Sequence, residues 1–217
     1  MEQFWQEMVK GGVMMIPLAF FSILGLAVFI EKLIVLRRKA VLTPEIVRLI
    51  ENLHDEDEVT QLRALCQVKP GPFARIVALA LENRNLPKEE IEGLIEEQGR
   101  QEVRVLERGL VALETVAGAS PLLGLLGTVL GMIKVFHVIA VQGVGQAAPL
   151  SAGISEALIT TAAGLSIGIP ALVAYNYFAS RAEGLILDIE KYSSLLLRRL
   201  RALALATQGQ EKALHKR

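Results

Sequence analysis

The chain has 217 residues, of which 52% are hydrophobic in type and 21% are charged, and its formal net charge at pH 7 is zero. This charge balance gives no argument for nucleic-acid binding, because no arginine and lysine cluster is interleaved with aromatic residues. The single cysteine, Cys66, allows no internal disulfide and makes a poor nucleus for a metal site. The apolar residues are gathered into three long uncharged blocks, a pattern that predicts a membrane protein.

The first apolar block covers residues 11–30 and has the length of one membrane span. Glu2 and Glu7 precede it, whereas a cleavable signal peptide would begin with basic residues, so we expect the span to be retained. Aromatic residues ahead of the block favour the boundary between water and lipid. We therefore expect an outer amphipathic segment over residues 1–10 and a first transmembrane helix over residues 11–36.

Basic residues set the expected orientation in the membrane. Arg37, Arg38 and Lys39 follow the first span, and the positive-inside rule places such a group in the cytoplasm. The N-terminus is then outside, and the C-terminal region, residues 181–217, returns to the cytoplasm after the third span. The same basic group could also meet anionic lipid headgroups, although a topology signal explains it at least as well.

The one large polar region, residues 37–113, has charges of both signs and helical periodicity, and it is expected to be cytoplasmic and helical. Thr43-Pro44-Glu45 has the pattern of a helix start, with a capping threonine, a proline at the first helical position and an acid in the first turn. Further starts are expected after the Pro-Gly-Pro break at residues 70–72 and at Pro87. The last of these helices is expected to run without interruption to Gly118, so that it enters the second span as one rod.

The second apolar block predicts a transmembrane helix over residues 114–137. Its small residues, which let membrane helices approach closely, are Gly124, Gly127 and Gly131. Pro121 leaves a backbone carbonyl without its helical donor, which is tolerable where another helix, a hydroxyl or water supplies one. Thr128 lies in the middle of the span, where a lone threonine more often bonds its own backbone. Lys134 lies near the outer end, where a cation reaching for the surface is ordinary.

A short loop, residues 138–148, makes the second and third spans an antiparallel hairpin. The third transmembrane helix is expected over residues 149–180, with Gly164 on its small-residue face and a bend at Pro170. Beyond it, apolar residues recur at intervals of four and three, as in a coiled-coil seam. They are Leu185, Ile189, Tyr192, Leu196, Leu200 and Leu203. We expect this seam to pack on the rod from the second span or on a copy of itself.

Glu156 is the only acidic or basic residue of the third span. A helix that starts at Pro149 carries it roughly 10 Å along the axis, below the membrane surface. Burial there disfavours the ionised carboxylate, so we interpret Glu156 as a proton-handling group. The alternative is an acid placed at a helix N-terminus by the helix dipole. Thr160, four residues on, shares the face of Glu156, whereas Thr161 lies about 140° away and is expected to point toward Thr128.

Two segments resemble the most recognisable motifs of the MotA/TolQ/ExbB family of ion-channel subunits, which drive work at a distance with the proton or sodium gradient. One is Ser120-Pro121-Leu122-Leu123-Gly124-Leu125-Leu126-Gly127-Thr128-Val129-Leu130-Gly131-Met132. The other begins Gly153-Ile154-Ser155-Glu156-Ala157-Leu158 and continues with Ile169-Pro170-Ala171 and Tyr175-Asn176. Leu130 stands where TolQ and ExbB proteins often have tryptophan.

The resemblance implies an all-α polytopic protein of the bacterial inner membrane, with three transmembrane helices, two of them extended into the cytoplasm. It also implies a homopentamer around the single helices of a partner like ExbD or TolR, whose aspartate takes the proton. By position, Thr128, Glu156 and Thr161 would line the passage. The absence of a larger cytoplasmic domain favours the TolQ/ExbB branch over a flagellar-stator-like subunit, and TolQ and ExbB both remain open. Hydroxyls and one carboxyl favour H⁺ over Na⁺.

Two other classes stay open. A non-conducting scaffold that anchors partner helices predicts that Glu156 can be replaced without loss of ion flow. A small secondary transporter fits less well, because three spans contain no internal repeat. No nucleophile motif, metal cluster or phosphate-binding loop supports an enzyme, and we expect no cofactor, no metal and no nucleic-acid partner.

Overall fold

The computed structural model describes residues 11–143, 145 and 147–214, with side chains as far as Ala206. All regular structure in these ranges is α-helix, which confirms the predicted all-α class. The expected outer segment, residues 1–10, lies outside the described residues, as do residues 215–217 of the expected C-terminal tail.

The chain divides into two compact units. The span unit comprises Met1–Lys32 and Gly109–Ala179, and the bundle unit comprises Leu33–Arg108 and Ser180–Arg217. The longest helix, α9 (Ala147–Leu214), contributes its first part to the span unit and its last part to the bundle unit.

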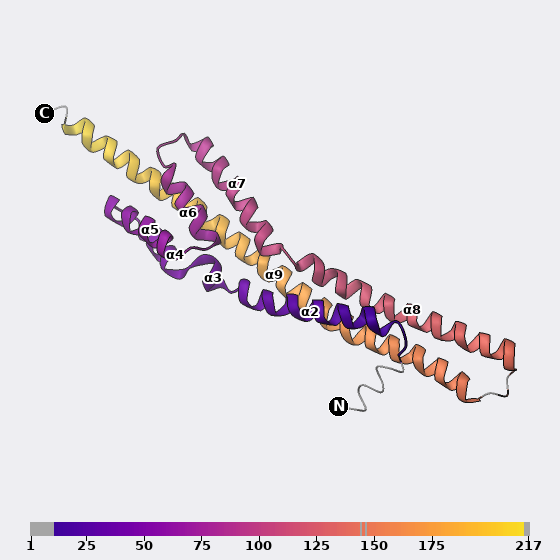
Figure 1. Cartoon of the computed structure of the whole chain (residues 1–217). Helices are drawn as coiled ribbons and strands as arrows, with labels where there is room; N and C mark the ends of the chain where they lie inside the picture. The colour runs from indigo at the N-terminus through magenta and orange to yellow at the C-terminus, as the bar shows by residue number, and fades with distance from the viewer. Residues whose placement is uncertain (1–10, 144, 146, 215–217) are drawn as a thin grey trace. The chain divides into compact units, whose positions relative to one another are not determined.

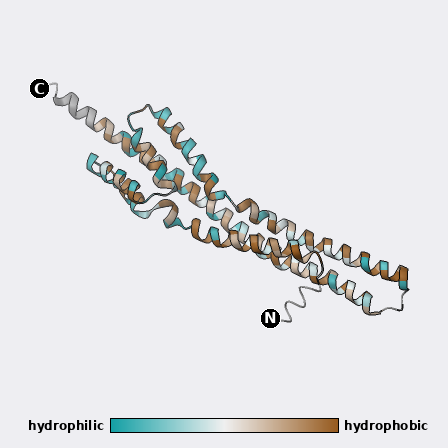
Figure 2. Ribbon diagram, viewed as in Figure 1, coloured by the Kyte–Doolittle hydropathy of each residue, from teal (hydrophilic) through white to brown (hydrophobic). Residues whose placement is uncertain are grey.

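The span unit contains α2 (Met15–Val35), α8 (Leu110–Gln142) and the first part of α9 (Figure 1). Each of the three contains a stretch that is long and apolar enough to cross a membrane, which confirms the three predicted membrane helices. Figure 2 shows long hydrophobic stretches along α2 and α8. Large apolar side chains such as Phe20 and Leu122 stay exposed, as a lipid-facing surface requires.

Helices α8 and α9 approach each other through residues that have little or no side chain. A Cβ atom added at Gly124 would lie 2.9 Å from the carbonyl oxygen of Thr160, and one added at Gly131 would lie 2.8 Å from that of Gly153. On the opposing helix, a Cβ at Gly164 would lie 2.5 Å from the carbonyl oxygen of Ser120. Backbone therefore packs on backbone, and this close approach is possible only where side chains are missing.

Both membrane prolines lie inside helices that continue past them. Pro121 is inside α8 and Pro170 is inside α9. Gly168 of α9 lies against the ring of Pro121, since a Cβ there would be 2.7 Å from Pro121 Cδ and 3.1 Å from the carbonyl oxygen of Ala117. The carbonyl that the proline deprives of its helical donor thus faces a glycine of the neighbouring helix.

Among the described residues, the bundle unit contains five shorter helices and the last part of α9. The five are α3 (Arg38–Leu42), α4 (Pro44–Glu51), α5 (Glu56–Val68), α6 (Pro72–Glu82) and α7 (Lys88–Glu107). Helices α4, α6 and α7 begin at the predicted proline positions. Thr43 does stand at the N-cap of α4, but it has φ 39° and its side chain makes no capping hydrogen bond.

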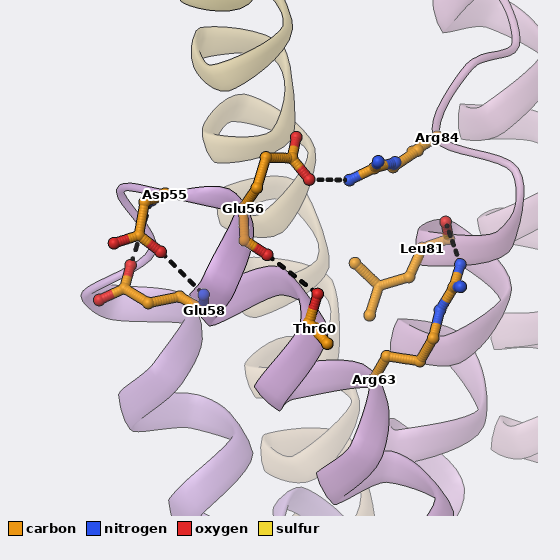
Figure 3. A network of polar contacts seen from close by, with 7 residues as sticks. All are labelled: Asp55, Glu56, Glu58, Thr60, Arg63, Leu81 and Arg84. Carbon is orange, nitrogen blue, oxygen red and sulfur yellow. Dashed lines mark hydrogen bonds and ion pairs between the residues drawn. The ribbon is translucent and has the colours of Figure 1, made fainter.

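Polar contacts fix the ends of the bundle helices. Asp55 forms a capping box with Glu58 at the start of α5, where the Asp55 carboxylate accepts from the Glu58 backbone N–H at 2.8 Å (Figure 3). Glu56 also forms an ion pair of 2.6 Å with Arg84, beyond the end of α6. Arg63 donates to the carbonyl oxygen of Leu81 at 3.3 Å, so α5 is tied to the end of α6.

The seam at the end of α9 is covered by its own chain. Leu185, Ile189 and Leu196 are all at most 5% exposed, and the rings of Tyr192 and Phe73 of α6 lie 6.3 Å apart. Arg199 donates to the carbonyl oxygen of Glu51 at 2.9 Å. The seam was predicted to pack either on the rod from the second span or on a copy of the chain. The structure shows packing within the chain, and the packing surface includes α6 in addition to the expected rod.

The prediction of one uninterrupted rod into the second span is wrong. Helix α7 ends at Glu107, Arg108 has ψ 128°, and Gly109 has φ +89° in the left-handed region before α8 begins. Glycine adopts this conformation without the steric penalty that a Cβ atom would cause. Gly109 is therefore the helix breaker that the sequence reading overlooked, nine residues ahead of Gly118.

Candidate functional site

The carboxylate of Glu156 lies at the α8–α9 interface of the span unit and forms an ion pair with Lys134. The Lys134 ammonium donates to both carboxylate oxygens, at 2.5 and 2.7 Å. The Glu156 side chain is only 18% exposed, whereas that of Lys134 is 55% exposed. The sequence reading found no basic partner within the third span, and it missed Lys134 because the partner comes from α8, 22 residues earlier.

Residues just before α2 lie against the same carboxylate. Gly12 has φ +67°, and a Cβ atom at this position would overlap Glu156 Oε1. Glycine is thus required here both by its conformation and by the space available. Gly11 lies next to Ile159 of α9, with 3.3 Å between a Cβ at Gly11 and Ile159 Cγ2. Segments from α8, α9 and the residues before α2 therefore surround Glu156.

Two threonines of α9 follow Glu156 along the interface. The Thr160 hydroxyl is buried beneath Gly127 and donates to the carbonyl oxygens of Ala157, at 2.9 Å, and Glu156, at 3.1 Å. The Thr161 hydroxyl crosses to α8 and donates to the carbonyl oxygen of Gly124 at 3.1 Å. The glycine leaves its carbonyl uncovered, so that the hydroxyl of the other helix can reach it.

Thr128 does not pair with Thr161 as expected. Its hydroxyl donates to the carbonyl oxygen of Leu125, in its own helix, at 2.6 Å. This is the alternative that the sequence left open for a lone threonine in a membrane helix. The prediction that Thr161 points toward Thr128 is wrong, because each hydroxyl donates to a backbone carbonyl oxygen instead.

Ser120 adds a polar atom that the sequence reading did not single out. Its hydroxyl is fully buried in α8 and has no hydrogen-bond partner among the residues that the structure describes. Its backbone carbonyl faces Gly164, one turn further along α9 than Thr160. Buried hydroxyls are rarely left unpaired, so Ser120 marks an unsatisfied polar position inside the span unit.

The three basic residues proposed for lipid headgroups differ in their contacts. Arg38 forms an ion pair with Asp188 at 2.8 Å, and Arg37 donates through Nε to the carbonyl oxygen of Leu33 at 3.2 Å. Lys39 is exposed. The Arg38 guanidinium is thus already engaged inside the bundle unit, which leaves Arg37 and Lys39 more available.

Comparison with known proteins places the chain in a family. Residues 69–191, more than half of the chain, match the MotA/TolQ/ExbB proton channel family. The chain belongs to this family. The predicted family is thereby confirmed, and together with the three membrane helices it indicates an inner-membrane protein.

Some of the relatives that are similar to this chain are named ExbB, and others are named TolQ. The ExbB-like protein 1 of Synechocystis sp. is 34% identical over 177 residues, which are 80% of this chain and 70% of that protein. The ExbB homologue of Methanothermobacter thermautotrophicus is 32% identical over 183 residues, or 83% of this chain and 64% of the relative. The Tol-Pal system protein TolQ of Pseudomonas aeruginosa is 45% identical over 86 residues, or 40% of this chain and 37% of the relative.

Proposed function

We propose that this chain is a proton-conducting subunit of an inner-membrane motor, and that Glu156 is the group that takes up and releases the proton. The observation that carries the proposal is the enclosed Glu156 carboxylate, paired with Lys134 at one end of a line of hydroxyls between α8 and α9. An enclosed carboxyl group in a membrane helix is a candidate for ion handling. Membership of a proton channel family supports the same reading.

Protonation of Glu156 changes its surroundings in a defined way. A proton on the carboxylate removes the negative charge that holds Lys134, whose half-exposed ammonium can then turn to water. Loss of the proton restores the pair. Lys134 is thus the counter-ion of the Glu156 carboxylate, and each proton that passes must break this contact.

The hydroxyls of Thr160, Thr161 and Ser120 continue from Glu156 along the interface. Hydroxyls can donate and accept, so they can order water or share a proton. The apolar parts of α8 and α9 contain no second carboxyl group. A complete relay therefore needs an acid from outside this chain, and we propose that it is an aspartate on a single-span partner like ExbD or TolR.

We further propose that several copies, five by the family resemblance, surround the partner helices. The seam of α9 is buried in its own chain and cannot supply this association. Exposed apolar side chains of α8 can, among them Leu125 at 58% and Val129 at 50% exposure. Association of the copies through their membrane helices also explains why small and apolar residues lie at the surface of α8. Native mass spectrometry in lipid is expected to give a pentamer, and a dominant monomer would contradict this.

The proposed orientation, with the N-terminus outside and the C-terminus in the cytoplasm, can be tested with an engineered cysteine. Gln61 is exposed on α5, so a Gln61→Cys variant should resist an impermeant thiol reagent in intact cells and react after permeabilisation. Cys66 cannot serve as the reporter, because it is buried and would stay unlabelled on either side. Labelling of Gln61→Cys in intact cells would reverse the orientation.

Proton uptake into liposomes that contain the chain with its partner tests the function directly. Glu156→Gln keeps the shape of the side chain and removes its charge, so it should abolish uptake while assembly is retained. Thr161→Val should lower uptake, whereas Thr128→Val should have a smaller effect, because the Thr128 hydroxyl bonds its own helix outside this line. Glu114→Gln is the matched control, because Glu114 is an exposed acid on the first turns of α8 outside this line.

Three outcomes distinguish the alternatives. Unchanged uptake in Glu156→Gln removes the proposed mechanism and favours a non-conducting scaffold. A helix-terminal acid predicts instead that Gln is tolerated and that Glu156→Ala loses about 1 kcal/mol of stability without loss of flux. Replacement of H⁺ by Na⁺ in the uptake assay tests which ion is carried, and only H⁺ is expected to support it.

A further inference from the structure

The bundle unit contains a groove of about 940 Å³ between α7 and the last part of α9. Ile76 of α6 lies against it, and further apolar side chains along its walls include Ile95, Val103, Ile189 and Leu197. Sites for small ligands are mostly apolar concavities of roughly 300–1,000 Å³ with a few polar groups. The groove has the size and lining of such a site, and it is separate from the line of hydroxyls in the span unit.

A buried hydroxyl without a partner lies in this lining. Ser193 is 4% exposed, and its Oγ has no hydrogen-bond partner among the described residues. An unsatisfied buried hydroxyl costs stability, and native proteins usually give it a partner. Ser193, Leu197 and Arg201 follow one another at intervals of four on α9, so they share one face of the helix. Of these three, Leu197 and Arg201 present an apolar side chain and a cation to the groove, whereas the Ser193 Oγ is itself buried.

The charges around the groove are unequal. Among the residues that the structure describes, five basic and three acidic side chains line it. Lys88 pairs with Glu92 at 3.6 Å, and Arg100 pairs with Glu97 at 2.8 Å. In contrast, among the described residues no carboxylate forms an ion pair with the remaining basic side chains, Arg104, Arg198 and Arg201, although Arg198 Nε donates to the carbonyl oxygen of Ser194 at 3.3 Å. The groove thus offers guanidinium groups that an anion can bind, and guanidinium groups suit carboxylate and phosphate oxygens.

We propose that this groove binds a small amphiphilic anion, an aliphatic chain that carries a carboxylate or phosphate head. The chain would lie along Ile95, Val103 and Ile189, and the head would be held by Arg198 and Arg201. Charge complementarity and the apolar walls support this occupant together, because a free inorganic anion would leave the apolar walls in contact with water and a neutral chain would make no use of the exposed guanidinium groups.

Two glycines of α7 provide a matched pair of variants. Gly99 lines the groove, and a Cβ atom added there would meet nothing within 4 Å, so a larger side chain enters the groove without a clash. Gly93 lies six residues earlier on the same helix, likewise meets nothing within 4 Å, and does not line the groove. Leucine is a better helix former than glycine, so neither Gly99→Leu nor Gly93→Leu should lower the stability of α7.

The experiment uses the full chain in phosphatidylcholine nanodiscs with two photoreactive probes of equal chain length. One is a diazirine-bearing hexadecanoate, and the other is the corresponding neutral hexadecanol. After illumination, labelled peptides are mapped by mass spectrometry. The carboxylate probe should label groove-lining peptides of α7 and α9 about tenfold more than the alcohol, as expected for a charge-assisted contact.

The variants then locate the site. Gly99→Leu should lower labelling by the carboxylate probe about tenfold, comparable to the loss of one good contact, while Gly93→Leu should label like the natural chain. Arg201→Gln should lower labelling by the carboxylate and leave labelling by the alcohol unchanged. This last variant keeps the groove open, so it tests the head group even if Gly99→Leu fails to fold.

Each contrary result overturns the proposal. Equal labelling by the two probes removes the anionic head, and labelling of the groove that Gly99→Leu does not reduce removes the groove as the site. If Gly99→Leu instead changes the number of copies seen by native mass spectrometry, a second copy of the chain occupies the groove. Proton uptake is not part of this test, so its outcome is independent of the function proposed for Glu156.

Discussion

The span unit and the bundle unit pack their helices by opposite means. Between α8 and α9, contact depends on missing side chains, since a Cβ atom at Gly124 or Gly164 would meet backbone of the other helix at 2.9 and 2.5 Å. In the bundle unit, large side chains such as Phe73, Ile76 and Leu196 are fully buried in the interior. Glycines of the bundle helix α7 meet nothing within 4 Å.

This difference follows from the solvent that each unit is built for. In lipid, exposed apolar side chains are already well solvated, so packing and hydrogen bonds draw the helices together and small residues allow close approach. In water, burial of apolar surface is itself the driving force, and charged side chains can remain at the rim. Replacement of a glycine by leucine should therefore lower the stability of the α8–α9 contact in the span unit, but not that of α7 in the bundle unit.

Substitution of a glycine at the α8–α9 contact is expected to give the largest effect. Gly164→Leu would place its side chain against backbone atoms of Ser120 and Gly124, which cannot move aside cheaply. We expect a loss of about 3 kcal/mol or more, at the upper end for an overpacked interior, measured by thermal unfolding in detergent. Gly118→Leu is the control, because Gly118 is exposed on α8 and a Cβ there meets nothing within 4 Å. Equal stabilities of the two variants would contradict backbone packing.

The bundle unit should be most sensitive at a buried carboxylate. Glu102 is 4% exposed at its side chain and accepts from Arg75 Nε at 2.7 Å and Nη2 at 2.5 Å. This hydrogen bonding also raises the pKa of Arg75. Loss of one partner of a buried pair costs about 3–5 kcal/mol. Because Arg75 is half exposed and Gln98 still donates to Glu102 at 2.8 Å, we expect about 2 kcal/mol for Arg75→Gln.

Denaturant unfolding of Arg75→Gln can be compared with Arg84→Gln. Arg84 forms the more exposed ion pair with Glu56, and the loss of such a surface pair costs about 0.5 kcal/mol. A similar cost for both variants would show that burial of Glu102 has little influence on stability.

The capping box of α5 should contribute less. Asp55→Ala removes the acceptor of the Glu58 backbone N–H, and we expect a loss of about 1 kcal/mol in denaturant unfolding. Asp55→Asn should keep most of the stability, because its amide oxygen still accepts. Asp57→Ala serves as the control in the same first turn, and an equal loss there would assign the effect to charge and not to the cap.

The smallest effect is expected from the exposed pair of Glu45 and Lys69. The hydrogen bond from Lys69, 2.7 Å long, holds the pKa of Glu45 below its ordinary value of 4.5. Since the folded pKa is lowered, the stabilisation is present above the unfolded pKa and is lost as the pH falls through the folded pKa. An NMR titration of labelled glutamate should show the Glu45 pKa rising in Lys69→Gln. An unchanged titration would exclude this pair as the cause.

Local patterns in the sequence were sufficient for most of the fold. Uncharged blocks long enough to span a membrane predicted the three membrane helices, and Pro44, Pro72 and Pro87 marked the starts of α4, α6 and α7. These signals depend only on neighbouring residues, because helix length and the missing N–H of proline are local properties. Membership of the family was likewise carried by two contiguous motifs.

The contacts of the site could not be read in the same way. The pairing of Lys134 with Glu156 depends on the register of α8 against α9, and the acceptor of Thr161 depends on how closely Gly124 approaches. The break at Gly109 was a local signal that was missed among charged residues. Sequence patterns thus identified Glu156 as a candidate proton-handling residue. Its ion-pair partner, Lys134, could be identified only from the packing of α8 against α9.

The only cysteine of the chain has a consequence for redox chemistry. Burial on α5 raises the pKa of the Cys66 thiol to about 11, from an ordinary value of 9.0. Only a thiolate attacks a disulfide or reacts readily with an oxidant. At neutral pH, Cys66 is therefore held in its unreactive form and covered by the bundle, so glutathione and peroxide should leave it unmodified. The protein can work beside an oxidising compartment while its own thiol takes no part in electron exchange.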